Sequence, residues 1–130
     1  MRYPECVDQL ILNGANLFSS GVKFRVQIPI ILGYHIAKLS AKKSAQAKAN
    51  AEMLGLMVND PNLRLNDLKK VKARTLVIAG TNDLIKASHT RMIFKNIENA
   101  EIAFVEGDHW IANKRYWKFN IEVEKFLDAR

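Results

Sequence analysis

An aspartate and a histidine each follow an apolar segment of this sequence, and their side chains together could carry out acid–base chemistry. Residues 73–83 read ARTLVIAGTND, an apolar run that ends in a glycine turn and Asp83. Residues 103–110 read AFVEGDHW and repeat the pattern around His109. A carboxylate that accepts the Nδ1 proton of an imidazole fixes its tautomer and leaves the other nitrogen free to act as a base. Asp83 and His109 are therefore candidates for two members of a catalytic triad.

The segments that contain or precede these residues have the pattern of buried parallel strands. TLVIAG (75–80) and AEIAFVEG (100–107) are short apolar runs bounded by turn residues. In an open α/β sheet, reactive groups collect outside the carboxyl ends of the strands. We therefore expect Asp83 and His109 to lie on loops at the same sheet edge, within reach of each other.

Each of these residues also has a purely structural explanation. Aspartate is common after strands because its side chain favours turns, and a histidine in a loop need not take part in chemistry. Asp108 is a competing partner for His109, but adjacent side chains rarely point at one another, so we expect a solvated turn carboxylate. Spacing alone does not decide between the catalytic and the structural explanation.

The first half of the chain predicts one strand followed by helical structure. VDQLIL (7–12) is a short, largely apolar segment that ends in the turn sequence NGAN, and we expect a strand there. Helix propensity is high from His35 to Met57. Pro29 and Gly33 are expected to break any longer helix.

The second half alternates strands with helices. A helix is expected over 86–97, with Ser88 as its cap, and an amphipathic helix over 113–130. Strand, helix, strand, helix implies parallel pairing through right-handed crossovers. The sequence therefore predicts an α/β fold with about three parallel strands.

Length and composition are those of an ordinary globular chain. The sequence has 130 residues, 48% of them hydrophobic and 25% charged, which fits one domain. The single Cys6 cannot form an internal disulfide, and no secretory leader is recognisable, so we expect a cytoplasmic protein. The longest apolar run contains a proline and a histidine and is too short to cross a bilayer.

The net charge of +7 is unevenly distributed, because no acidic residue lies between Asp8 and Glu52. The basic residues in that interval are Lys23, Arg25, Lys38, Lys42, Lys43 and Lys48. Such a segment could face nucleic acid, an anionic membrane or acidic substrates. A solvated helix face is favoured over nucleic-acid binding, because no aromatic or arginine-rich motif accompanies the lysines.

The order of these segments resembles the carboxyl-terminal half of α/β-hydrolase-fold proteins. YPECVDQLILNGAN, a helical insertion and LNDLKKVKARTLVIAGTNDLIKASHTRMIFKNIENAEIAFVEGDHWI carry the resemblance. In that family the acid follows the penultimate core strand and the histidine follows the last one, which match Asp83 and His109. The resemblance implies a single partial domain over 1–130.

Within that domain, the resemblance assigns a helical lid or cap to about 17–58 and the core to 1–16 and 59–130. It also implies a nucleophile in a Gly-x-Ser-x-Gly elbow, and this sequence contains no such motif. The available serines have no elbow context and are expected in turns or on helix surfaces: Ser19, Ser20, Ser40, Ser44 and Ser88. We therefore expect the nucleophile and the oxyanion hole to lie outside this chain.

The expected activity of the complete enzyme is hydrolysis of a small-molecule ester or a related acyl bond, with His109 as the base and Asp83 orienting it. No cofactor is expected, and no metal, since His35 and His89 join no cluster with metal-ligand spacing. The alternative is a non-catalytic α/β module in protein–protein association. Because strand 7–12 would have an open edge, we expect a homo-oligomer or association with a chain that carries the first half of the fold.

Overall fold

The computed structural model describes residues 4–129 and divides the chain into two compact units. One unit comprises the described residues up to Ala15 together with those from Arg64 onward. The other comprises Asn16–Leu63.

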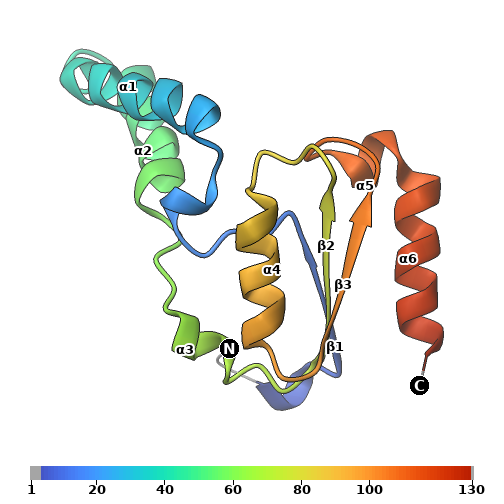
Figure 1. The fold of residues 1–130 in the computed structure, drawn as a ribbon. Coiled ribbons are helices and arrows are strands. Elements are labelled where there is room, and N and C mark those ends of the chain that lie inside the picture. The colour runs from blue at the N-terminus through green and yellow to red at the C-terminus, as the bar shows by residue number, and fades with distance from the viewer. Residues whose placement is uncertain (1–3, 130) are drawn as a thin grey trace. The chain divides into compact units, whose positions relative to one another are not determined.

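The larger unit is built on a three-stranded parallel sheet. Its strands are β1 (Gln9–Asn13), β2 (Arg74–Gly80) and β3 (Ala100–Val105), in the order β1-β2-β3. Figure 1 shows β2 between its two neighbours. Ile78 of β2 pairs with Asn13 on one side and Ala103 on the other. The prediction of an α/β fold with about three parallel strands is confirmed.

The central strand is apolar from Leu76 to Ala79, because helices cover both of its faces. Val77, Ile78 and Ala79 are fully buried, and successive residues of a strand point to opposite faces. Helix α4 (Ala87–Asn96) packs on β2 and β3, and α6 (Tyr116–Asp128) packs beside β3 on the other side of the sheet (Figure 1). The core on the α6 side consists of Leu76, Ile78, Val105, Ile111 and Phe126, with Ile11, Ala103, Phe119 and Val123 packed against it.

Three short helices complete this unit: a 3-10 turn (Pro4–Cys6), α3 (Leu65–Leu68) and α5 (Ile111–Lys114). The expected Ser88 cap is wrong, because α4 begins at Ala87 and Ser88 lies within its first turn. Lys86 occupies the N-cap position, and its side chain makes no capping hydrogen bond. Cys6 is exposed.

The smaller unit consists of a 3-10 turn (Ser19–Gly21), helix α1 (Phe24–Ser40) and helix α2 (Ala45–Asn59). The two helices pack against each other as a hairpin (Figure 1). The expected break at Pro29 and Gly33 is wrong, since α1 runs through both residues.

A proline in a helix removes one backbone hydrogen bond, and contacts along α2 compensate for that loss because tertiary packing supplies most helix stability. The helical segment is interrupted later, before Ser44, whose hydroxyl caps α2 by accepting from the Ala47 amide at 3.1 Å. Within residues 4–129, no helix has the length and hydropathy needed to cross a membrane.

Candidate active site

The loops that follow β2 and β3 are bound to each other by backbone hydrogen bonds. The Thr81 amide donates to the Val105 carbonyl at 2.9 Å, and the Asn82 amide donates to the Gly107 carbonyl at 2.8 Å. Gly80 permits this approach, because a β-carbon there would collide with the Asp108 carbonyl oxygen. The residues that follow the two loops are therefore held close together at the carboxyl edge of the sheet.

Asp83 and His109 are in direct contact at this edge. The distance between Asp83 Oδ1 and His109 Nδ1 is 2.7 Å, and the Asp83 side chain is only 2% exposed. The backbone amide of Ile85 donates to the same Oδ1 at 2.9 Å, and that of Gly80 donates to Oδ2 at 3.3 Å. The carboxylate is thus fixed on both oxygens, and the expected proximity of the two side chains is confirmed.

The His109 ring is held on one side and open on the other. Nδ1 meets the carboxylate, while 33% of the side chain is exposed. Among residues 4–129, no group forms a hydrogen bond with Nε2. The indole of Trp110 stands edge-on to the ring, with centroids 5.7 Å apart. A partly exposed imidazole, with a buried carboxylate at Nδ1 and no described partner at Nε2, is the arrangement a general base requires.

Gly14 lies against the Cε1 and Nδ1 edge of the imidazole, and sequence reasoning missed it. The residue directly follows β1, has a φ of +55° and donates its amide to the Ile78 carbonyl at 2.9 Å. A β-carbon at this position would lie 2.7 Å from His109 Cε1, 2.8 Å from Nδ1 and 3.4 Å from Asp83 Oδ2. Glycine is therefore needed for its backbone conformation and for space. The signal in the sequence was NGAN, which indicates a turn but not a contact.

Asp108, the competing partner for His109, is engaged elsewhere. Its Oδ1 accepts from the Trp110 amide at 2.9 Å, and its Oδ2 pairs with Lys114 Nζ at 2.5 Å. The hydrogen bond from Lys114, together with that from the Trp110 amide, lowers the pKa of Asp108. Asp108 is thus a turn carboxylate, as expected, and does not orient the histidine.

The other candidate groups have contacts or surroundings of their own. Ser44 caps a helix, and Ser88 lies exposed on α4. His89 is buried in α4, where loss of solvent, and then the charge of Lys86, lower its pKa. Within residues 4–129, no three His, Cys, Asp or Glu side chains form a group that could hold a metal ion.

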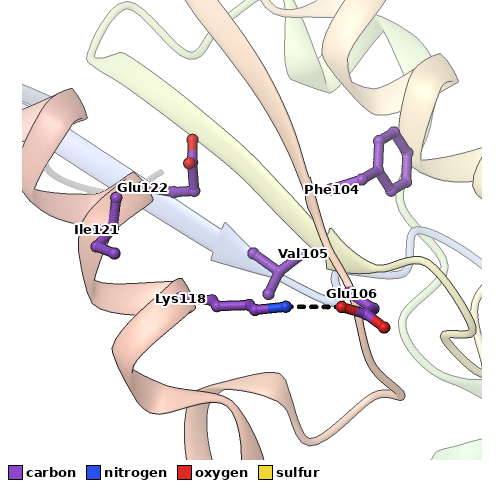
Figure 2. A pocket seen from close by; sticks show the side chains of 6 residues that line it. All are labelled: Phe104, Val105, Glu106, Lys118, Ile121 and Glu122. Atoms are coloured by element: carbon purple, nitrogen blue, oxygen red, sulfur yellow. Dashed lines mark hydrogen bonds and ion pairs between the residues drawn. The ribbon is translucent and has the colours of Figure 1, made fainter.

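A hollow of about 190 Å³ lies between the end of β3 and α6 (Figure 2). Phe104, Val105 and Ile121 form part of its wall, and the ion pair between Lys118 Nζ and Glu106, at 2.6 Å, runs along one side. Ligand pockets usually measure about 300–1,000 Å³. Because the hollow is smaller and includes neither Asp83 nor His109, we do not assign it to substrate.

Comparisons with known proteins find matches among solved structures alone: no family model and no curated protein sequence matches the chain. A meta-cleavage product hydrolase from Pseudomonas fluorescens IP01 is 20% identical with a TM-score of 0.63, and the match covers 98% of this chain and 58% of that one. A putative non-heme bromoperoxidase from Mycobacterium tuberculosis H37Rv is 14% identical with a TM-score of 0.68, over 95% and 59% of the two chains. This chain has the α/β-hydrolase fold.

A thermophilic esterase shares that α/β-hydrolase fold with 26% identity and a TM-score of 0.61, over 97% of this chain and 58% of the esterase. The chain therefore spans less than three fifths of the length of these structures, and its α/β-hydrolase fold is partial. The catalytic role of Asp83 and His109 and the assignment of about 17–58 as a lid remain predictions.

Proposed function

We propose that this chain carries the acid and the histidine of a hydrolase that cleaves an ester or a related acyl bond of a small molecule. The observation that carries the proposal is the 2.7 Å contact between buried Asp83 and His109 Nδ1. The α/β-hydrolase fold supports it, because in that fold the acid and the histidine follow two successive strands. Here they follow β2 and β3.

In the proposed reaction, His109 moves a proton in both directions through Nε2. It first takes the proton of an attacking hydroxyl, and the imidazolium then gives that proton to the leaving group. Asp83 accepts the Nδ1 proton throughout, so it keeps Nε2 available and stabilises the positive ring. The amides of Gly80 and Ile85 hold the carboxylate in place for this task.

The attacking hydroxyl and the oxyanion donors belong to another polypeptide segment in this proposal. No residue of the sequence stands in a Gly-x-Ser-x-Gly elbow, and both oxyanion donors of the fold come from outside the two loops described above. Among the described strands, β1 pairs with β2 alone. Its other edge is available for the missing segment.

The same free edge favours a second candidate, a non-catalytic module that associates with another protein. Leu10, Ile11 and Leu12 of β1 are only partly buried, and an open apolar edge recruits further strands. This candidate requires no particular chemistry of His109, which distinguishes it from the hydrolase.

A hybrid protein tests the hydrolase directly. Residues 1–130 would be joined to the part of the thermophilic esterase that the match leaves uncovered, and the hybrid assayed with an activated ester and a fluorophosphonate probe. We expect activity that falls at least about 10³-fold on His109→Gln, since removing a triad member is that costly. The matched control, His35→Gln, changes an exposed histidine on α1 and should leave activity intact.

Chain 1–130 alone should neither hydrolyse the ester nor react with the probe. A folded, probe-reactive hybrid whose turnover is unchanged by His109→Gln would contradict the proposal. So would labelling of any serine in the isolated chain that is lost on His109→Gln.

A further inference from the structure

Helix α1 of the smaller unit exposes a continuous row of large apolar side chains. The row lies at spacings of four or three residues, which places its members on one helix face. Its members and their exposed fractions are Phe24 (70%), Ile28 (45%), Leu32 (60%), Ile36 (57%) and Leu39 (81%). We call them the α1 stripe. A single exposed apolar residue needs no explanation, but a contiguous row marks a surface that meets another molecule.

Positive charge flanks the stripe at both ends, with Lys23 and Arg25 beside Phe24 and three lysines around Leu39. Residues 16–63 contain six basic residues and only two acidic ones, Glu52 and Asp60. Lys38, Lys42 and Lys43 lie at the end of α1 and in the turn that follows it. His35, Lys38, Leu39 and Lys42 line one shallow hollow there. We call residues 35–43 the hairpin tip.

The lysines of the hairpin tip have few interaction partners within the described part of the smaller unit. Lys38 Nζ lies 5.8 Å from the centre of the Tyr34 ring. Among residues 4–129, neither Lys42 nor Lys43 has an ion-pair partner, and the nearest ion pair along the chain joins Lys48 and Glu52 at 3.9 Å. These ammonium groups are therefore free to meet an external anion.

We propose that the hairpin tip and the α1 stripe dock on an anionic lipid bilayer. Apolar side chains beside lysines suit the boundary between acyl chains and anionic headgroups, where the apolar groups enter and the ammonium groups remain at the phosphates. Leu39 is the most exposed member of the stripe and lies between Lys38 and Lys42. Its side chain could therefore enter the acyl region while the two ammonium groups remain at the headgroups.

Charge and side-chain type favour a bilayer over the other occupants of such a surface. A second copy would bring two strongly basic tips together, and like charges repel. Single-stranded nucleic acid usually stacks on aromatic side chains, whereas the exposed side chains here are mostly aliphatic. The proposal is independent of the catalytic role of Asp83 and His109.

Co-sedimentation of the 130-residue chain with vesicles tests the proposal. Binding is expected to vesicles of phosphatidylcholine with about 30 mol% phosphatidylglycerol, and much less to phosphatidylcholine alone. Each of Lys38→Gln, Lys42→Gln and Lys43→Gln should lower the partition constant roughly fivefold. Leu39→Ser should lower it roughly tenfold, because the leucine no longer enters the apolar phase. Salt at about 0.5 M should weaken binding through screening.

A second lysine-lined hollow supplies the matched control. Lys69, Lys72 and Lys95 border it together with Asn96 and Glu98, without an exposed aliphatic side chain in its lining. The triple change Lys69→Gln, Lys72→Gln, Lys95→Gln removes three positive charges, as Lys38→Gln, Lys42→Gln and Lys43→Gln do when combined, and should leave vesicle binding nearly unchanged.

Three results would overturn the proposal. The first is a loss of binding in the control triple variant equal to that of the combined Lys38→Gln, Lys42→Gln, Lys43→Gln variant. The second is no vesicle binding by a chain whose circular dichroism shows folded helices. The third is binding to an anionic oligonucleotide at salt where the vesicles are not bound.

Discussion

The backbone of Gly14 lies against the His109 ring so closely that a β-carbon at position 14 would stand 2.7 Å from Cε1. The first strand of the sheet therefore contributes to the site without providing a reactive group. The Gly14 backbone restricts the position of the imidazole sterically. Asp83, 2.7 Å from Nδ1, orients the ring by a hydrogen bond. The position of the ring is thus determined by residues far apart in the sequence.

Gly14→Ala should displace the His109 ring and weaken its hydrogen bond to Asp83. The added methyl group collides with Nδ1, and the φ of +55° disfavours any residue with a β-carbon. We expect a loss of about 1–3 kcal/mol in the free energy of unfolding, measured with urea. Gly33→Ala is the control, because its β-carbon would make an ordinary contact 3.7 Å from Leu54 in a helix. Equal losses in the two variants would contradict the assignment.

Asp83→Asn should destabilise the larger unit. Both oxygens of the carboxylate accept hydrogen bonds, from His109 and from the amides of Ile85 and Gly80. In asparagine one of these oxygens becomes an NH₂ group, which donates and cannot accept. A buried donor left without an acceptor costs about 1–3 kcal/mol, so a loss of that size is expected in denaturant unfolding. Asp108→Asn, on the partly exposed turn carboxylate beside His109, should cost far less. A comparable loss in both variants would mean that the buried hydrogen bonds of Asp83 contribute no more to stability than those of Asp108.

The larger unit was predictable from the sequence where local pattern and tertiary structure agree. Residues 76–79 of TLVIAG are all apolar because helices cover both faces of β2, so the strand and the aspartate after it could be located from the sequence. His109 could be assigned to the same sheet edge because parallel strands end together. A fold can be predicted from its sequence where the local hydrophobic pattern agrees with the tertiary environment.

Prediction failed where a distant contact overrides the local pattern. Pro29 and Gly33 are helix breakers, yet α1 continues through them because it packs along α2. The need for glycine at position 14 depends on a ring that is 95 residues away along the chain, so NGAN showed only a turn. Ser88 has the side chain of a helix cap, but α4 begins before it.

Stability should fall as the solution is acidified below the ordinary pKa of histidine. Burial, followed by the charge of Lys86, lowers the pKa of His89 from 6.5 in the folded chain. The unfolded chain therefore binds a proton first, so the contribution of His89 is complete above 6.5 and is lost between 6.5 and the lower folded-state pKa. Urea unfolding at about pH 7.5 and about pH 5.5 measures the slope. His89→Gln should flatten it, and His35→Gln should not; a slope unchanged by His89→Gln would refute the assignment.

The chain should not behave as a single free molecule in solution. β1 has one strand neighbour in the described sheet, and the edge it leaves open favours pairing with a second copy or with a chain that supplies the rest of the fold. Sedimentation equilibrium at low micromolar concentration should give a mass above that of one chain. A monomer mass across that range would show that this edge is protected.

Nitrogen NMR of histidine-labelled chain tests the central claim, that Asp83 fixes the tautomer of His109, most directly. In the neutral ring we predict a proton on Nδ1, shifted downfield by the 2.7 Å contact with the carboxylate, and an unprotonated Nε2. Asp83→Asn should abolish the downfield shift, while Asp108→Asn should preserve it. A neutral ring protonated on Nε2, or an Nδ1 proton that ignores Asp83→Asn, would contradict the account.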